Sequence, residues 1–167
     1  MHLAIPVGAL LWLCILPAPT TFAAGRPPAV EPSAIWPALR TLRSEVLNGT
    51  VVRAQIFYMP YHVVTFARVD PQALEHAADY KETVEISSDL RDTLAAAIDG
   101  TKLYRIRRGP DVRWGAVFLD KSDRRVHSIY LNGRLINGAG RRGHIDGADV
   151  GLNGALVTWF ELNFLKR

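Results

Sequence analysis

Apolar residues recur at helical spacing in three stretches of the chain, and each stretch begins at a residue type that caps helices. Such a stripe usually forms the side of a helix that packs on a core. The pattern therefore predicts three helices, with a turn or one short helix between residues 70 and 78. The predicted caps are Ser33, then Ser88 or Asp89, then Asn153, and the stripes are Leu39, Leu42 and Val46, then Leu90, Leu94, Ala97 and Ile98, then Leu156, Trp159, Phe160 and Phe164.

Between these stretches, apolar residues alternate with polar ones or gather in short β-rich runs, which is the pattern of strands. Two pairs of runs are separated by connections of hairpin length, one at residues 121–124 and one at the tight Asp146-Gly147 turn. We expect antiparallel hairpins at both places. The predicted strands are 50–59, 63–69, 82–87, 112–120, 125–131, 142–145 and 148–152, and the anchors of the first hairpin are Trp114, Phe118, Ile129 and Tyr130.

The order of these elements predicts an α+β fold. We expect a single domain over residues 33–167, with an antiparallel β-sheet of about five to seven strands and two or three helices packed on one face. Strands and helices do not alternate in the regular way of a parallel βαβ sheet, and no long repeat is present. A domain of this length can bury a core of its own.

The first 24 residues read as a cleavable secretory signal peptide. Residues 3–16 form an uncharged apolar run that is shorter than a bilayer span, and small residues follow it, so that cleavage fits after Ala23 or Ala24. A retained anchor stays an alternative, because the start of the chain lacks Lys and Arg. Residues 25–32 are Pro-rich and predict a disordered lead-in to the domain.

The only cysteine, Cys14, lies within this predicted signal peptide. The mature chain would therefore have no disulfide, no thiolate metal site and no cysteine nucleophile. An exported domain without disulfides is more typical of the bacterial envelope, so we expect a periplasmic or secreted protein with no transmembrane segment after the signal is removed.

Charge is distributed unevenly along the chain, which has a net charge of +4. Residues 70–100 contain eight acidic and two basic residues, and residues 101–142 contain eleven basic and three acidic ones. Either the two blocks lie side by side and neutralise each other, or the basic block forms an exposed surface. Such a surface would suit an acidic protein or an anionic envelope component, whereas export makes nucleic acid a poor partner. The predicted binding residues are Arg124, Arg125, Arg134, Arg141 and Arg142.

Candidate catalytic residues are few. His144 and Asp146 are two residues apart on a predicted strand and turn, where they would lie on the same side of the chain, and an imidazole oriented by a carboxylate can act as a base. Asp146 is equally explained by the turn that it forms with Gly147. The sequence contains no nucleophile elbow, phosphate loop or zinc-protease motif, and nothing in it indicates a cofactor or a metal site.

These observations favour a non-catalytic binding protein of the envelope, in one specific form an inhibitor or immunity partner of an exported enzyme. Two alternatives stay open. One is a small envelope hydrolase that uses His144 and Asp146, and the other is a component that binds anionic lipid or glycan through the same arginines.

Overall fold

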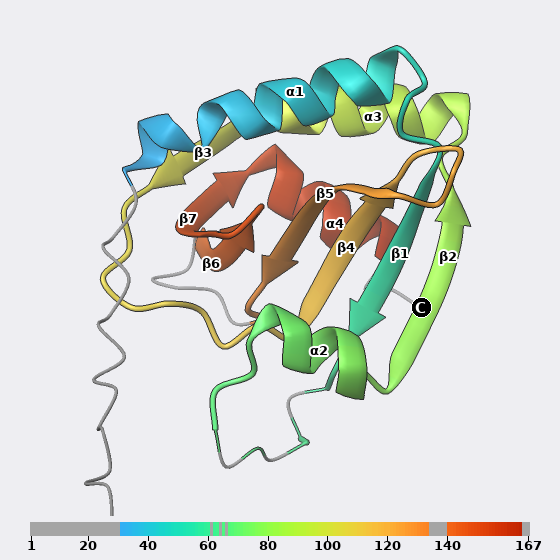
Figure 1. Ribbon diagram of the computed structural model, residues 1–167. Coiled ribbons are helices and arrows are strands. Elements are labelled where there is room, and N and C mark those ends of the chain that lie inside the picture. The colour runs from blue at the N-terminus through green and yellow to red at the C-terminus, as the bar shows by residue number, and fades with distance from the viewer. Residues whose placement is uncertain (1–30, 61, 64, 66, 134–139, 165–167) are drawn as a thin grey trace, which may run out of the picture.

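The computed structural model describes residues 31–60, 62, 63, 65, 67–133 and 140–164, which form one seven-stranded antiparallel sheet with helices on both faces (Figure 1). The strand order is β2-β1-β4-β5-β6-β7-β3. The α+β prediction is therefore confirmed. The strands are β1 (Arg53–Tyr58), β2 (Tyr80–Glu85), β3 (Thr101–Tyr104), β4 (Trp114–Leu119), β5 (Arg125–Leu131), β6 (Gly140–Ile145) and β7 (Ala148–Gly154), and the helices are η1 (Pro32–Ala34), α1 (Trp36–Leu47), α2 (Pro71–Ala77), α3 (Ser88–Asp99) and α4 (Ala155–Phe164).

Three longer helices cover one face of the sheet. α1 packs beside α3, and α3 packs beside α4, which lies behind the sheet in the view of Figure 1. The predicted apolar stripes point inward from all three helices. They meet the side chains that the central strands direct to the same face, and together these residues make the main core. Its most completely buried members include Leu39, Leu42, Leu94, Ile98, Trp114, Phe118, Ile129, Leu131, Leu152, Leu156 and Phe160.

The short helix α2 lies on the opposite face, in front of the sheet in Figure 1. It begins after Asp70, whose carboxylate accepts a hydrogen bond of 2.8 Å from the Ala73 amide and so satisfies one free donor of the first turn. Leu74 of this helix is fully buried. The second, smaller core beneath it contains Phe57, Met59, Val69, Val112, Val117, Leu119 and Tyr130.

Both predicted hairpins are present. In the connection between β4 and β5, the Asp120 carboxylate accepts hydrogen bonds from the amides of Ser122 and Arg124, at 2.8 and 3.0 Å. The turn between β6 and β7 places Asp146 at φ 44° and Gly147 at φ 91°. Both values lie in the left-handed region that a two-residue hairpin turn requires, and Asp-Gly is a dipeptide that adopts it readily.

The predicted strand 63–69 is wrong for those of its residues that the structure describes. β1 pairs with β2 on one side and with β4 on the other, so it has no free edge for this segment. The Arg113 guanidinium instead donates hydrogen bonds to the Val63 carbonyl and the Thr65 hydroxyl, at 3.1 and 3.2 Å. These bonds hold the segment as a loop.

The start of α4 also differs from the prediction. β7 continues to Gly154, so Asn153 lies in a strand and does not cap the helix. Gly154 turns the chain at φ 92°, and the Thr101 hydroxyl accepts a hydrogen bond of 3.3 Å from the Leu156 amide. The cap is therefore supplied by β3, a four-residue strand that is too short to be predicted from alternation.

The other two caps shift as well. Ser87 rather than Ser88 or Asp89 precedes α3, and its hydroxyl accepts a bond of 3.4 Å from the Leu90 amide. Ser33 lies within η1, and α1 follows Ile35 without a side-chain cap. A cap is set by the backbone of a single residue, which composition alone does not fix.

The predicted signal peptide, residues 1–24, and nearly all of the predicted lead-in, 25–32, lie outside the described residues. Pro32 already opens η1. Among the helices that the structure describes, none combines the length and the apolar character needed to cross a bilayer.

Candidate functional site

Arg141 and Arg142 were predicted to share a binding surface, but the structure places them on opposite faces of the sheet. Successive residues of a strand point to opposite sides. Arg141 is 7% exposed and points to the helix face, where its guanidinium pairs with Glu161 of α4 and bonds to the Gly133 carbonyl. Arg142 belongs to the other face. Arg141 is therefore buried on the helix face and does not contribute to an exposed surface.

Arg124 and Arg125 lie at the far end of β5, and each has a carboxylate partner. Arg124 pairs with Asp120 at 2.7 Å within the hairpin connection. Arg125 pairs with Glu75 of α2 at 2.9 Å and donates to the Tyr130 hydroxyl at 2.6 Å. Arg134 lies outside the described residues. The four predicted arginines that the structure describes thus do not form one surface.

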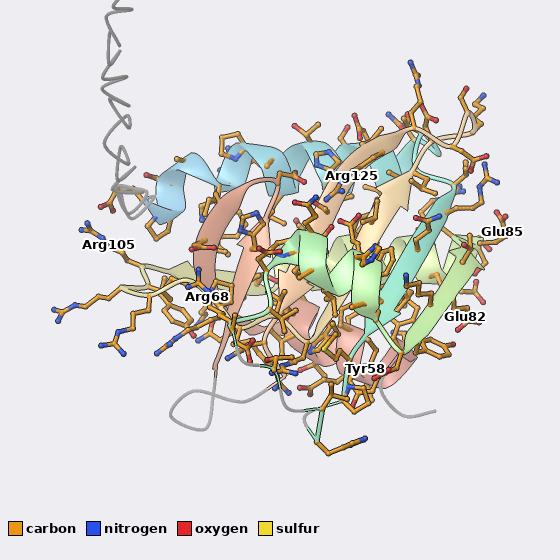
Figure 2. The ribbon with its side chains drawn as sticks, turned by 60° about the horizontal axis from the view of Figure 1, so that its bottom comes forward. Tyr58, Arg68, Glu82, Glu85, Arg105 and Arg125 are labelled. Carbon is orange, nitrogen blue, oxygen red and sulfur yellow. The ribbon has the colours of Figure 1, made fainter. Side chains whose placement is uncertain are left out.

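The exposed positive charge is concentrated at the β3 edge of the sheet instead. Arg68 and Arg105 project from the same end of the molecule in Figure 2, and Lys102 lies on β3 itself. All of these side chains are exposed, and Arg105 forms an exposed ion pair with Glu31 at 3.1 Å. Arg68 comes from the loop before α2, far away in sequence, so no inspection of the 101–142 block alone could have included it. The cationic end, as we call it, comprises Arg68, Lys102, Arg105, Arg107 and Arg108.

The negative charge is concentrated at the opposite edge. Glu82 and Glu85 lie on the edge strand β2, on the side of the molecule away from Arg68 and Arg105 in Figure 2. Asp89 and Asp92 follow at the start of α3 and are exposed. With six strand spacings of about 4.8 Å between β2 and β3, the two edges are roughly 29 Å apart.

The acidic and basic blocks of the sequence are therefore not packed against each other as a whole. Glu75 pairs with Arg125 across the two blocks, but Asp99 pairs with Arg43 of α1 at 2.7 Å. Glu85 lies 4.0 Å from Arg53 of β1, which is also outside the basic block. Segregation of charge describes the molecule better than neutralisation.

His144 and Asp146, the candidate catalytic pair, do not meet. β6 ends at Ile145, and the positive φ of Asp146 turns its side chain away from that of His144. His144 Nδ1 instead lies 3.0 Å from Asp149 Oδ1, its cross-strand neighbour on β7. Spacing on one strand suggested the wrong partner, because the turn begins between the two residues.

Asp146 instead holds a different histidine. Its Oδ2 lies 2.5 Å from Nδ1 of His127, and its Oδ1 accepts a hydrogen bond of 2.7 Å from the Ser128 amide. On the other side of the ring, Nε2 of His127 lies 3.3 Å from Glu45 of α1. His127 is only 9% exposed, so this array ties the end of α1 to the β6–β7 turn.

The two carboxylates set the protonation of this array. Burial opposes a charged imidazole, but the hydrogen bond and charge of Asp146, with those of Glu45, outweigh it and raise the pKa of His127 above its ordinary value. Burial alone would raise the pKa of Asp146, yet His127 and the Ser128 amide lower it overall. Nδ1 of the ring is hydrogen-bonded to Asp146, whereas Nε2 has only the charge contact with Glu45 at 3.3 Å.

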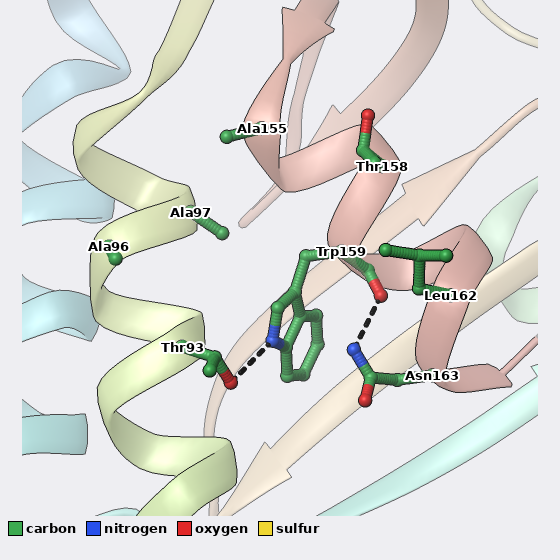
Figure 3. Close-up of a pocket in the computed structure, with 8 residues that line it drawn as sticks. All are labelled: Thr93, Ala96, Ala97, Ala155, Thr158, Trp159, Leu162 and Asn163. Atoms are coloured by element: carbon green, nitrogen blue, oxygen red, sulfur yellow. Dashed lines mark hydrogen bonds between the residues drawn. The ribbon is translucent and has the colours of Figure 1, made fainter.

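An open groove of about 580 Å³ runs between α3 and α4 (Figure 3). Its walls are mostly small or apolar side chains, and Leu162 at its rim is 55% exposed. The Trp159 indole donates a hydrogen bond of 3.0 Å to the Thr93 hydroxyl across the floor. The lining residues are Thr93, Ala96, Ala97, Ala155, Thr158, Trp159, Leu162 and Asn163, none of which is an ionisable group.

Within the described part of the chain, no three His, Cys, Asp or Glu side chains are placed to hold a metal ion. In comparisons with known proteins, no family model, no curated protein and no solved structure matches this chain. The candidate site that the geometry supports is therefore the cationic end of the sheet together with the adjoining sheet face.

Proposed function

We propose that this chain is an exported, non-catalytic binding protein of the bacterial envelope that docks on an acidic protein partner, in one specific form as an inhibitor or immunity partner of an exported enzyme. The observation that supports this proposal is the cationic end. Exposed arginines gathered at one end of a rigid sheet can meet carboxylates through planar, bidentate hydrogen bonds. Complementary charge of this kind speeds association and selects the partner.

The hydrolase alternative loses its original basis, because His144 and Asp146 are not partners. The lipid or glycan alternative draws on the same cations. The two proposals predict that the chain captures different material, lipid or polysaccharide in one case and a protein in the other. One capture experiment therefore distinguishes them.

The experiment immobilises the chain from Gly25 to Arg167 and exposes it to envelope and secreted fractions of its own cell. We expect one acidic protein to be retained in stoichiometric amount at low salt and to be weakened at high salt, because exposed charge pairs are screened. Retention of lipid or polysaccharide alone would contradict the proposal.

Two double variants test the surface. Lys102→Ala/Arg108→Ala removes two exposed charges from the cationic end, and among the described residues neither side chain has an ion-pair partner. Arg40→Ala/Lys121→Ala removes the same charge from exposed positions elsewhere. We expect the first variant to weaken partner binding by about tenfold or more and the second to leave it within about twofold. Equal weakening of partner binding by the two variants would show that binding depends on the net charge of the chain and not on where the charges lie.

A further inference from the structure

Arg142, His144 and Tyr104 share the sheet face that is opposite to α1, α3 and α4. Arg142 and His144 are two residues apart on β6 and therefore point to the same side. Across β7, Arg142 is in register with Gly151, and Gly151 is in register with Tyr104 on β3. These strands thus bring a guanidinium, an imidazole and a phenol into one neighbourhood beside the cationic end.

Glycines make the floor of this neighbourhood. A Cβ at Gly151 would lie 2.1 Å from the Tyr104 ring, and one at Gly140 would lie 2.4 Å from the Tyr104 hydroxyl oxygen. The ring therefore lies flat across β7 and β6, and its hydroxyl donates a bond of 3.2 Å to the Arg141 carbonyl. Burial raises the pKa of Tyr104, and the positive charge of Arg142 opposes that rise.

The backbone beneath Arg142 is fixed. Its amide donates a hydrogen bond of 3.0 Å to the Asn132 side chain, and its carbonyl accepts one of 2.9 Å from the Asn132 amide. The side chain is half-buried, yet among the described residues it has no carboxylate partner. A half-buried cation without a counter-charge keeps its full capacity to bind an anion.

His144 supplies a second free position. Its Nδ1 is held by Asp149, and among the described residues its Nε2 has no hydrogen-bond partner. Asp149 and Arg68 both lie beside Gly109, where a Cβ would be 2.4 Å from Asp149 Oδ2 and 2.7 Å from Arg68 Nη1. The ion pair of Asp149 is with His144, and among the described residues Asp149 forms none with Arg142.

We infer that Arg142 and His144 form a carboxylate-binding site that receives an acidic side chain of a docked polypeptide. The inference rests on the proposed function and names the anchor point within it. The planar fork of Arg142 matches the two oxygens of a carboxylate. The Nε2 atom of His144 adds one further donor when the ring is protonated. A tetrahedral phosphate would call for more donors than these two side chains provide.

The probe is triglutamate, with inorganic phosphate for comparison, and the readout is the NMR signal of the His144 imidazole together with calorimetric affinity. We expect saturable triglutamate binding that shifts the His144 signal. Arg142→Ala should weaken it by about tenfold. Arg124→Ala, which removes the same charge at the opposite end of β5, should change it by less than about twofold.

Equal weakening by the two variants, no saturable binding, or tighter binding of phosphate than of triglutamate would overturn the inference. Partner capture separates it from the proposed function. If Lys102→Ala/Arg108→Ala abolishes capture while triglutamate binding survives Arg142→Ala, the cationic end is the docking surface and the carboxylate site is refuted. If Arg142→Ala abolishes triglutamate binding while no acidic protein is captured, the site stands and the proposed function fails.

Discussion

At the scale of single residues, the buried imidazole of His127 has the largest consequence for stability. It is placed between Asp146 and Glu45, whose side chains are 26% and 27% exposed. Removing the imidazole leaves two partly buried carboxylates without their shared partner, although Asp146 keeps its hydrogen bond from the Ser128 amide. We expect His127→Ala to lower the free energy of unfolding by about 2 kcal/mol near pH 6, measured by urea unfolding.

The same array predicts a pH profile. The folded pKa of His127 is raised above 6.5, so its contribution is complete below pH 6.5 and is lost as the pH rises through the folded value. The folded pKa of Asp146 is lowered below 3.8, so its contribution is complete above pH 3.8 and is lost as the pH falls through the folded value. The difference in unfolding free energy between wild type and His127→Ala should therefore be greatest between these two values. A difference that is constant from pH 4 to 8 would contradict this account.

Tyr130 is the residue that fastens α2 to the sheet. Its ring lies over Gly115, where a Cβ would come within 2.3 Å, and its hydroxyl bonds to Glu75 and Arg125. Burial, with the Glu75 carboxylate next, raises the pKa of this hydroxyl, so the phenol stays neutral and donates. A completely buried side chain with two charged partners fixes one position of the helix.

We expect Tyr130→Phe to speed hydrogen exchange of the α2 amides while leaving α3 unchanged, because only α2 loses an anchor. The measurement is hydrogen exchange followed by mass spectrometry. Glu82→Gln, on the edge strand β2, is the control. Equal protection of α2 in wild type and Tyr130→Phe would show that Leu74 alone docks this helix.

At the scale of elements, Thr101 joins three of them. Its hydroxyl donates a hydrogen bond of 2.8 Å to the Ala97 carbonyl at the end of α3 and accepts the one from the Leu156 amide at the start of α4. Thr101 is 4% exposed. If its hydroxyl were absent, neither the Ala97 carbonyl nor the Leu156 amide could form a replacement hydrogen bond to water. One side chain thus closes two helix ends.

We expect Thr101→Val, which keeps the shape and removes the hydroxyl, to lower the unfolding free energy by about 1–3 kcal/mol in chemical denaturation. Thr83→Val, at an exposed position of β2, serves as the matched control and should change it by less than about 0.5 kcal/mol. A loss in the control that equals the loss at Thr101 would contradict a capping role.

The sequence pattern predicted correctly those elements that are determined by residues within the element itself. The stripes of α1, α3 and α4 and both hairpins are local properties, and the structure contains them all. Features that depend on a residue far away in the sequence were not predicted. The cap of α4 comes from Thr101, and the loop at 63–69 is held by Arg113, a residue nearly fifty positions away.

At the scale of the whole molecule, the candidate site too was predicted only as far as the local sequence determines it. The block of positive charge was visible in sequence, but which of its members face solvent was not. Arg141 and Arg142 are adjacent in sequence yet separated by the thickness of the sheet, and Arg68 joins the cationic end from an unrelated loop. Asp149, the partner of His144, was not predicted, because residue spacing alone does not show that a turn begins between His144 and Asp146.

The separation of Arg68 and Arg105 from Glu82 and Glu85 also gives the molecule a permanent electric dipole moment along the direction of strand order. The field of a charged surface exerts a torque on this dipole, so the approaching protein turns its β3 edge toward negative potential before any contact forms. A larger fraction of diffusional encounters then occurs in an orientation that allows binding. The fold thereby acts on the rate of association through its orientation in a field, in addition to the bonds that follow.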